Sequence, residues 1–342
     1  MAYTTINKPT DYFNTKLYTG DGTDGREITG VGFQPDWCWF KARSTAYENQ
    51  VYDVVRGATK RLVTNDTTAE GTQTNGLQSF DSDGFTVGNG NGTNVNAVTY
   101  ASWNWLANGT GVSNTDGSIT STVSANTTSG FSIGTYTGNV TAGSTVGHGL
   151  GNVPKVVITK STSHTSNWAF YHYSNGAGNR LVLNATDASS SNNGYWNSTD
   201  PSSSVFTLGD EGNDTNGSGK DYVFYAFAEK PGFSKFGSYT GNGSTDGTFI
   251  YTGFKPAMVI FKPTSTTGNW FILDNKRNTI NPLTLSLFTN LSDAETGTYT
   301  SDFLSNGIKI RLSGNPNSSG VSYIYMAFAE EPLVGDNPAT AR

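Results

Sequence analysis

The sequence contains one cysteine and few charged residues. Cys38 is the single cysteine among 342 residues, so a disulfide within the chain is excluded. Charged residues make up 14% of the chain, against about 25% in typical soluble domains. The formal net charge is −6 and no cluster of Lys and Arg occurs, so nucleic acid is a poor candidate partner. Gly, Ser, Thr and Asn replace the missing charge, which predicts a neutral surface rich in hydroxyl groups.

Long apolar runs are also missing. No segment approaches the ~18 consecutive apolar residues of a membrane-spanning helix, so no membrane insertion is expected. The N-terminal residues lack the basic and apolar regions of a secretory signal. We therefore expect a protein that is made in a cytoplasm and either stays there or leaves it by lysis.

Helical periodicity is nearly absent, and short alternating runs take its place. Apolar runs rich in β-branched and aromatic residues occur at 155–160 and 258–262, and each ends in a polar turn. Pro35, Pro154 and Pro256 each stand just before such a run, as expected at the entry of a strand. Asn-Gly and Asp-Gly turn signals recur throughout the chain. The pattern predicts an all-β, antiparallel protein.

One sequence pattern occurs three times. Each copy opens with Tyr-Thr-Gly, continues through a Pro and an apolar run, and closes with an aromatic-rich strand. The copies share a length of roughly 90 residues, which is enough for one β-sandwich. They run from Tyr18 to Trp105, from Tyr136 to Phe227 and from Tyr239 to Phe328.

The repeats predict a domain organisation of three tandem antiparallel β-sandwiches. We call residues 18–109, 131–232 and 233–332 the first, second and third repeats. The remaining segments are an N-terminal arm at 1–17, a polar linker at 110–130 and a C-terminal tail at 333–342. Within the linker, residues 119–123 alternate, so an edge strand is expected there.

The closing strands carry the most regular aromatic pattern. Because side chains alternate along a strand, one face of each holds the pairs Trp103 and Trp105, Tyr225 and Phe227, and Met326 and Phe328. Such a face serves either as a platform for sugar rings or as the core face of a sandwich. Its recurrence in all three repeats favours the core face.

Tyr195 and Trp196 are a candidate ligand-binding pair. They lie between polar stretches and match no core strand. An exposed Tyr-Trp pair on a loop is suited to stacking on a sugar or anchoring an interface.

The segment 210–217 is a candidate calcium site. Asp210, Asp214 and Asn216 offer several oxygen ligands on one loop, as Ca²⁺ prefers. The alternative is that these residues serve tight turns for backbone reasons. No other cofactor is expected.

Signals of catalysis are missing. The sequence has no Gly-x-Ser-x-Gly elbow and no phosphate-binding loop, and nothing singles out a pair of carboxylates. We therefore expect a protein that is not an enzyme, with a carbohydrate-active enzyme as the remaining alternative.

Three segments of the chain resemble modules in virion proteins of tailed bacteriophages. They are Thr-Tyr-Thr-Gly at 135–138 followed by Val-Gly-His-Gly-Leu-Gly at 146–151, the run 233–243, and the opening at 7–15. The match is good over 130–330 and looser over 1–110. Those modules are lectin-like β-sandwiches of the concanavalin-like or jelly-roll kind, in tail fibres or other surface-exposed proteins. No catalytic residues come with the resemblance.

The resemblance implies a structural protein on the virion surface, either a tail fibre or a tail-associated protein that binds host-surface glycans. A head decoration or capsid-stabilising protein is the alternative. The implied partners are other virion proteins, further copies of this chain (a trimer among the options) and host-surface carbohydrate.

Overall fold

The computed structural model describes residues 4–297, 299–334, 338 and 339. It is built from β-strands, with one short 3₁₀ helix, η1 (Pro9–Asp11). Strands that neighbour one another in the sheets pair antiparallel, so the all-β antiparallel prediction is confirmed. No helix among the described residues combines the length and apolarity needed to cross a membrane.

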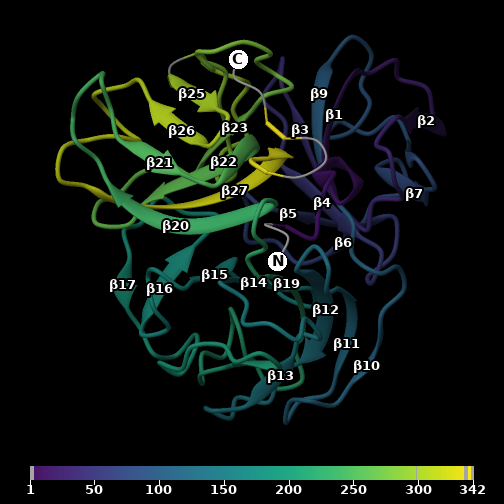
Figure 1. Ribbon diagram of the computed structural model, residues 1–342. Coiled ribbons are helices and arrows are strands. Elements are labelled where there is room, and N and C mark those ends of the chain that lie inside the picture. The colour runs from purple at the N-terminus through teal and green to yellow at the C-terminus, as the bar shows by residue number, and fades with distance from the viewer. Residues whose placement is uncertain (1–3, 298, 335–337, 340–342) are drawn as a thin grey trace.

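Three large sheets surround the centre of the molecule (Figure 1). The first, in spatial order, contains β1 (Phe13–Thr19), β9 (Thr99–Trp105), β3 (Trp37–Ala42), β4 (Gln50–Asp53), β5 (Lys60–Val63) and β6 (Gly71–Thr72). The second contains β10 (Val112–Asn114), β11 (Ser121–Asn126), β12 (Phe131–Thr137), β19 (Asp221–Phe227), β14 (Val156–Ser161), β15 (Ala169–His172), β16 (Asn179–Val182) and β17 (Ser190–Ser191). The third contains β20 (Ser234–Thr240), β27 (Ser322–Pro332), β22 (Phe254–Pro263), β23 (Phe271–Asp274) and β24 (Leu287–Phe288).

A smaller sheet belongs to each repeat. These sheets are formed by β2 (Arg26–Thr29), β8 (Gly84–Val87) and β7 (Leu77–Asp81); by β13 (Thr145–Gly147) and β18 (Val205–Thr207); and by β21 (Phe249–Tyr251), β26 (Gly307–Ile310) and β25 (Ser301–Leu304). An apolar cluster fills each repeat, with residues from both of its sheets.

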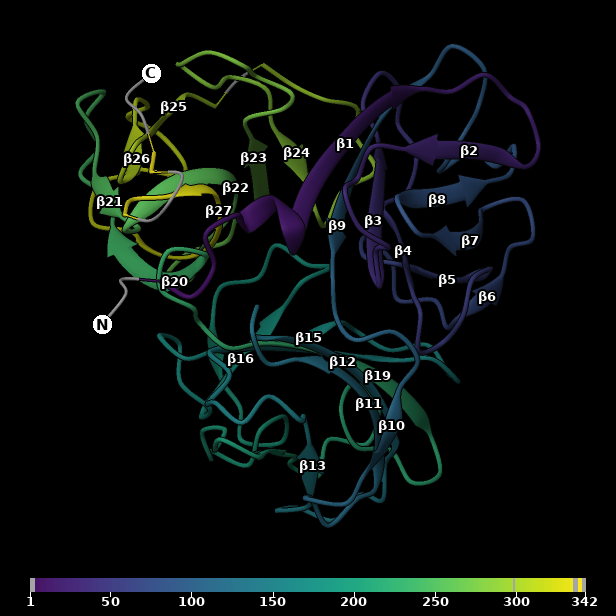
Figure 2. The same ribbon diagram turned by 45° about the vertical axis from the view of Figure 1, so that its right-hand side comes forward.

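Residues 110–130 differ from the expected polar linker. They contribute β10 and β11 to the second large sheet, and β11 pairs with β12 along its whole length (Figure 2). The expected arm at 1–17 is also shorter, because β1 begins at Phe13 and pairs with β9. Of the expected tail at 333–342, residues 335–337 and 340–342 lie outside the described residues.

The three prolines that precede apolar runs do not all lie outside strands. Pro35 and Pro154 come before β3 and β14, as expected. Pro256 lies inside β22, and the register against β27 shifts on both sides of it. A bulge accommodates Pro within a strand because the ladder is already interrupted there.

The tyrosine of each Tyr-Thr-Gly opening packs against the closing strand of its repeat and bonds the loop that precedes that strand. In the second repeat the Tyr136 ring stacks on Tyr222 with centroids 5.1 Å apart. The Tyr136 hydroxyl donates to the Thr215 carbonyl at 2.6 Å, and the Tyr222 hydroxyl accepts from the Gly217 N–H at 2.8 Å. The equivalent stacked pairs are Tyr18 with Tyr100 and Tyr239 with Tyr323.

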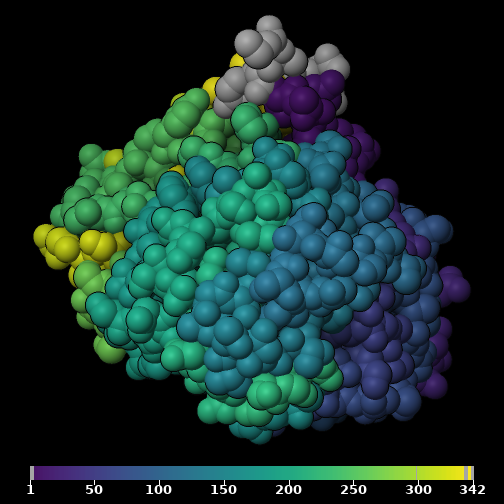
Figure 3. Space-filling view, turned by 90° about the horizontal axis from the view of Figure 1, so that it is seen from below, coloured from purple at the N-terminus to yellow at the C-terminus, as the bar shows by residue number. Residues whose placement is uncertain are grey.

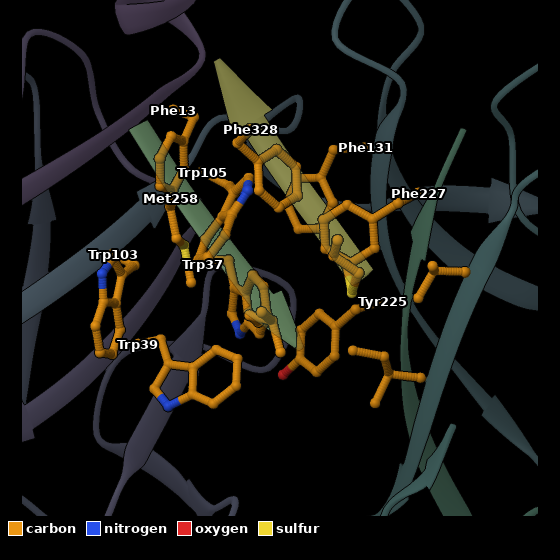
Figure 4. Close-up of a cluster of buried hydrophobic side chains, with 14 of the residues drawn as sticks. Phe13, Trp37, Trp39, Trp103, Trp105, Phe131, Tyr225, Phe227, Met258 and Phe328 are labelled. Carbon is orange, nitrogen blue, oxygen red and sulfur yellow. The ribbon is translucent and has the colours of Figure 1, made fainter. Parts of the chain in front are cut away.

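The aromatic face of the closing strands is buried, but not inside its own sandwich. In Figure 4 the side chains of this face from all three repeats gather in one cluster, which we call the central core. The Phe328 ring lies 5.4 Å from Trp105 and 5.8 Å from Phe227, measured between centroids. The opposite face, including Tyr222 and Phe224, fills the sandwich interior. The closing strands β19 and β27 are therefore apolar on both faces, whereas the opposite face of β9 carries Tyr100 and the buried polar residues Ser102 and Asn104.

One loop of seven residues in each repeat contacts another repeat, and we call these loops, 64–70, 183–189 and 289–295, the hook loops. In the second repeat the buried Lys160 ammonium donates at 3.0 Å to the carbonyl of Thr67, in the first hook loop, and at 3.0 Å to that of Ser166. In the same way Lys262 reaches Thr186, and Lys41 reaches Ser292. The contacts run from repeat to repeat and return to the first, so the three repeats close a ring.

Indole N–H groups make a second set of contacts around the ring. Trp168 donates to the Val63 carbonyl at 2.8 Å, and Trp270 donates to the Val182 carbonyl at 3.0 Å. The strand register places Asn49 where the other repeats have Trp. Its side-chain amide donates to the carbonyl of Phe288 at 3.1 Å and so completes the set.

Two buried ion pairs, each formed within one repeat, also bond a side chain of another repeat. Arg56 contacts Asp53 at 2.6 Å, and the same carboxylate accepts the Tyr225 hydroxyl of the second repeat at 2.7 Å. The equivalent pair in the third repeat is Asp274 with Arg277, and the Asp274 carboxylate accepts the Trp103 indole N–H of the first repeat.

Replacing Phe328 with Ala tests the central core. The side chain is 1% exposed and its loss should cost about 3–5 kcal/mol of the free energy of unfolding. Because its ring contacts all three repeats, the molecule should melt at lower temperature in a single transition, as measured by calorimetry. Phe249→Ala, at a residue 43% exposed, is the control and should change melting little. Loss of the third repeat alone, with the others still folded, would contradict a shared core.

The three buried lysines should make the free energy of unfolding depend on pH. Burial lowers the pKa of Lys41, Lys160 and Lys262 to about 8. The unfolded chain, with a lysine pKa of ~10.4, therefore holds more protons between about pH 8 and 10, and this contribution to the free energy of unfolding rises with pH there. Below that window both states are protonated and the contribution is constant. Titration of ¹³Cε-labelled lysines by NMR should show three midpoints near 8, and midpoints near ~10.4 for all lysines would contradict it.

Candidate functional site

The structure places Tyr195 and Trp196 in the interior of the second repeat. They are 1% and 2% exposed, and the Trp196 ring packs edge-on against Tyr171 and Phe206 at 5.9 and 6.4 Å between centroids. The expectation of an exposed pair was wrong, because the polar loop that carries these residues folds over the sandwich. As placed, neither ring is available for stacking on a ligand.

The candidate calcium ligands are engaged with the protein. The Asp214 carboxylate accepts the Asn167 backbone N–H at 2.7 Å and the Tyr195 hydroxyl. Asn216 is buried, and its side-chain amide bonds three backbone groups of neighbouring turns. Asp210 is exposed. The arrangement matches the turn-forming alternative, and the described residues contain no group of three or more His, Cys, Asp or Glu that could hold a metal ion.

A polar cavity of about 470 Å³ opens where the first repeat meets the third hook loop. We call it the amide cavity. Its walls come from the segment before β4, from β5, from the turns after β6 and before β9, and from the hook loop. The lining residues are Ala46, Tyr47, Glu48, Gln50, Arg61, Gln73, Asn75, Asn91, Gly92 and Ser292.

The amide cavity depends on a glycine in the first repeat. A Cβ atom at Gly92 would lie 2.2 Å from the Gln50 Cδ, so a side chain there would require the amide to move. The Tyr18 hydroxyl donates to the Thr93 carbonyl and the Tyr136 hydroxyl to the Thr215 carbonyl, so Asp214 is the equivalent of Gly92 in the second repeat. There the carboxylate fills the space and bonds Tyr195 and Asn167. The same fold therefore holds a cavity in one repeat and a side chain in another.

Side-chain amides supply half of the polar side chains that line the cavity. Gln50 is 2% exposed, and its Oε1 accepts the Tyr52 hydroxyl at 2.8 Å. Its Nε2 donates no hydrogen bond to any described residue, although the side chain lines the cavity. Gln73, Asn75 and Asn91 add further amides. Each amide offers donors and an acceptor, which is the combination that hydroxyl groups require.

Opposite charges compensate one another at the cavity. Arg61 pairs with Glu48 at 3.3 Å, and both side chains are partly exposed. Lys41 fixes one wall, since its ammonium donates to the carbonyls of Tyr47 and Ser292 at 2.6 and 2.8 Å. The cavity is therefore close to neutral, and it suits an uncharged ligand with several hydroxyls better than an ion.

Sequence reasoning did not identify these residues. They are spread between positions 46 and 92, with one more at Ser292, and no motif connects them. One signal was available, which is Gly92 at the position of Asp214 in the second repeat.

The described geometry defines a closed ring of β-sandwiches with one amide-lined cavity at a junction between repeats. The chain belongs to the DUF7483 family, a domain of unknown function, whose model matches residues 8–332. No curated protein matches the chain, and no solved structure matches it.

Proposed function

We propose that this protein is a structural virion protein of a tailed bacteriophage, a tail fibre or tail-associated protein that binds host-surface glycans in the amide cavity. The observation that carries the glycan part is the neutral cavity lined by Gln and Asn side chains. The assignment to a phage particle rests on the sequence resemblance at 135–151 and 233–243.

The chemistry of the cavity supports recognition without catalysis. Hydrolysis of a glycosidic bond generally requires two carboxylates about 5–10 Å apart. Glu48 is the one carboxylate among the lining residues, and Arg61 pairs with it. We therefore propose a binding protein that leaves its ligand intact. Binding at one cavity is expected to be weak, and many copies on a particle would raise the avidity.

The ring supports a second candidate, a head decoration or capsid-stabilising protein. Equivalent contacts by Lys41, Lys160 and Lys262 relate the three repeats in a cycle. A molecule with this internal arrangement can present similar surfaces to three neighbours at a threefold position of a shell. In that role the partners are other virion proteins, and the amide cavity has no receptor function.

Substitutions in the amide cavity test glycan binding. Asn75 is exposed, and Gln73 is half-buried with one long hydrogen bond, 3.4 Å from the Tyr52 hydroxyl, so Gln73→Ala and Asn75→Ala should each change melting little. Each should weaken the binding of a glycan identified on an array by roughly 2- to 10-fold, as expected for one hydrogen bond. Gln78→Ala is the matched control, because this amide lies outside the cavity and bonds Asp24. Calorimetric titration gives the affinities, and equal affinities for all variants would place the glycan elsewhere.

Immunogold electron microscopy of whole phage tests the position on the particle, with an antibody against the third repeat. Gold on the tail or on projecting fibres is expected from a receptor-binding role. Gold spread evenly over the head would instead favour the decoration role. Particles that carry no gold, while the same antibody detects the purified protein, would refute both.

A further inference from the structure

A second cavity, of about 340 Å³, lies between the first and second repeats. Figure 3 shows these two repeats, purple to blue and blue to green, in contact along one face of the molecule. Residues 120–122 and the second repeat contribute mainly hydroxyl-bearing side chains, and the first repeat contributes the Arg56–Glu70 ion pair. The lining residues are Arg56, Glu70, Thr120, Ser121, Thr122, Thr135, Tyr136, Thr137, Thr162, Asp221 and Tyr222.

The junction between the third and first repeats has the same backbone arrangement. The Glu70 N–H donates to the Thr162 carbonyl at 3.0 Å, and the Glu295 N–H donates to the Arg43 carbonyl at 2.8 Å. Glu70 and Glu295 each end a hook loop. Thr162 and Arg43 each lie two residues after a buried lysine, so the two pairs occupy equivalent positions.

At the junction of the third and first repeats, Arg43 fills the space beside the glutamate. Its Nε and Nη2 lie 3.2 and 2.9 Å from the two oxygens of Glu295, a bidentate contact. Arg277 donates to the same carboxylate at 2.9 Å. The chain therefore contains one example of a guanidinium bound in this setting.

At the junction of the first and second repeats, that guanidinium is missing. Arg56 contacts Glu70 at 3.1 Å, as Arg277 contacts Glu295, but the side chain beside them is the short Thr162. The cavity occupies the place of the absent arginine.

Acidic groups favour a cation in this cavity. Asp221 also lines it, accepts the Thr137 hydroxyl at 2.7 Å, and has no ion-pair partner among the described residues. Lys60 lies 3.6 Å from the other oxygen of Glu70, with its side chain 41% exposed, so it neutralises that carboxylate only in part.

We propose that this cavity binds a guanidinium group, the arginine side chain of a partner polypeptide. Glu70 would accept the fork of N–H groups as Glu295 does, and Asp221 would add a second carboxylate. The hydroxyls of Thr120, Thr122 and Thr137 border the exposed side of the cavity, where they can bond the peptide groups next to the arginine. The proposal is independent of the amide cavity and of the glycan ligand.

Two peptide-like probes and one variant test this proposal. N-acetyl-arginine amide should bind the full chain at least about tenfold more tightly than N-acetyl-citrulline amide, its uncharged analogue. Thr162→Arg should place the chain's own guanidinium beside Glu70, raise the melting temperature and abolish binding of the arginine probe.

Thr264→Arg is the matched control. It is the equivalent position at the junction of the second and third repeats, where the hook loop ends in Ser189 instead of a glutamate. That variant should gain no stability and should bind the arginine probe as the wild type does. The proposal is overturned if the wild type fails to bind the arginine probe, binds both probes equally, or keeps its affinity in Thr162→Arg.

Discussion

The mutual burial of three aromatic sheet faces is the constraint on which the structure depends. One face of each closing strand meets the central core through residues such as Trp105, Phe227 and Phe328, and the opposite face lines its own sandwich. A single repeat in isolation would expose the face that meets the central core to water, and exposed apolar area of this kind is strongly disfavoured. The repeats are therefore parts of one folding unit, although each has the size of an independent domain.

Polar contacts around the core determine how the repeats are joined. Ammonium and indole groups are costly to bury unless they are hydrogen-bonded. Lys160 and Trp168 satisfy this requirement by donating to carbonyls of the neighbouring repeat. A rotation of one repeat against the next would leave these donors without partners. The central core thus supplies the driving force for association, and the hook loops fix its geometry.

The sequence was sufficient to predict the strands but not their environment. Apolar runs after Pro35 and Pro154 form β3 and β14, and the Tyr-Thr-Gly openings lie on strands next to the closing strands. In the second and third repeats, alternation could not tell which face of the closing strand meets a partner repeat, because both faces of β19 and β27 are apolar. The prediction that Trp196 is exposed failed because its neighbours in sequence are polar, although the loop that carries it folds over the sandwich and buries the ring. The amide cavity is lined by loops that are far apart in the sequence, so no local sequence pattern could predict that they meet.

The hook loops have a consequence for how the junctions can diverge. In a trimer of identical chains, every junction must carry the same pair of residues. Here the three copies are covalently joined, and the equivalent pairs are Arg43 with Glu295, Thr162 with Glu70, and Thr264 with Ser189. Fusion thus frees one junction to be closed by a salt bridge, a second to stay open and acidic, and a third to be neutral. The equivalent contacts of the three repeats form the ring. Because the repeats are linked in one chain, the residues at one junction can differ from those at the others while the ring is retained.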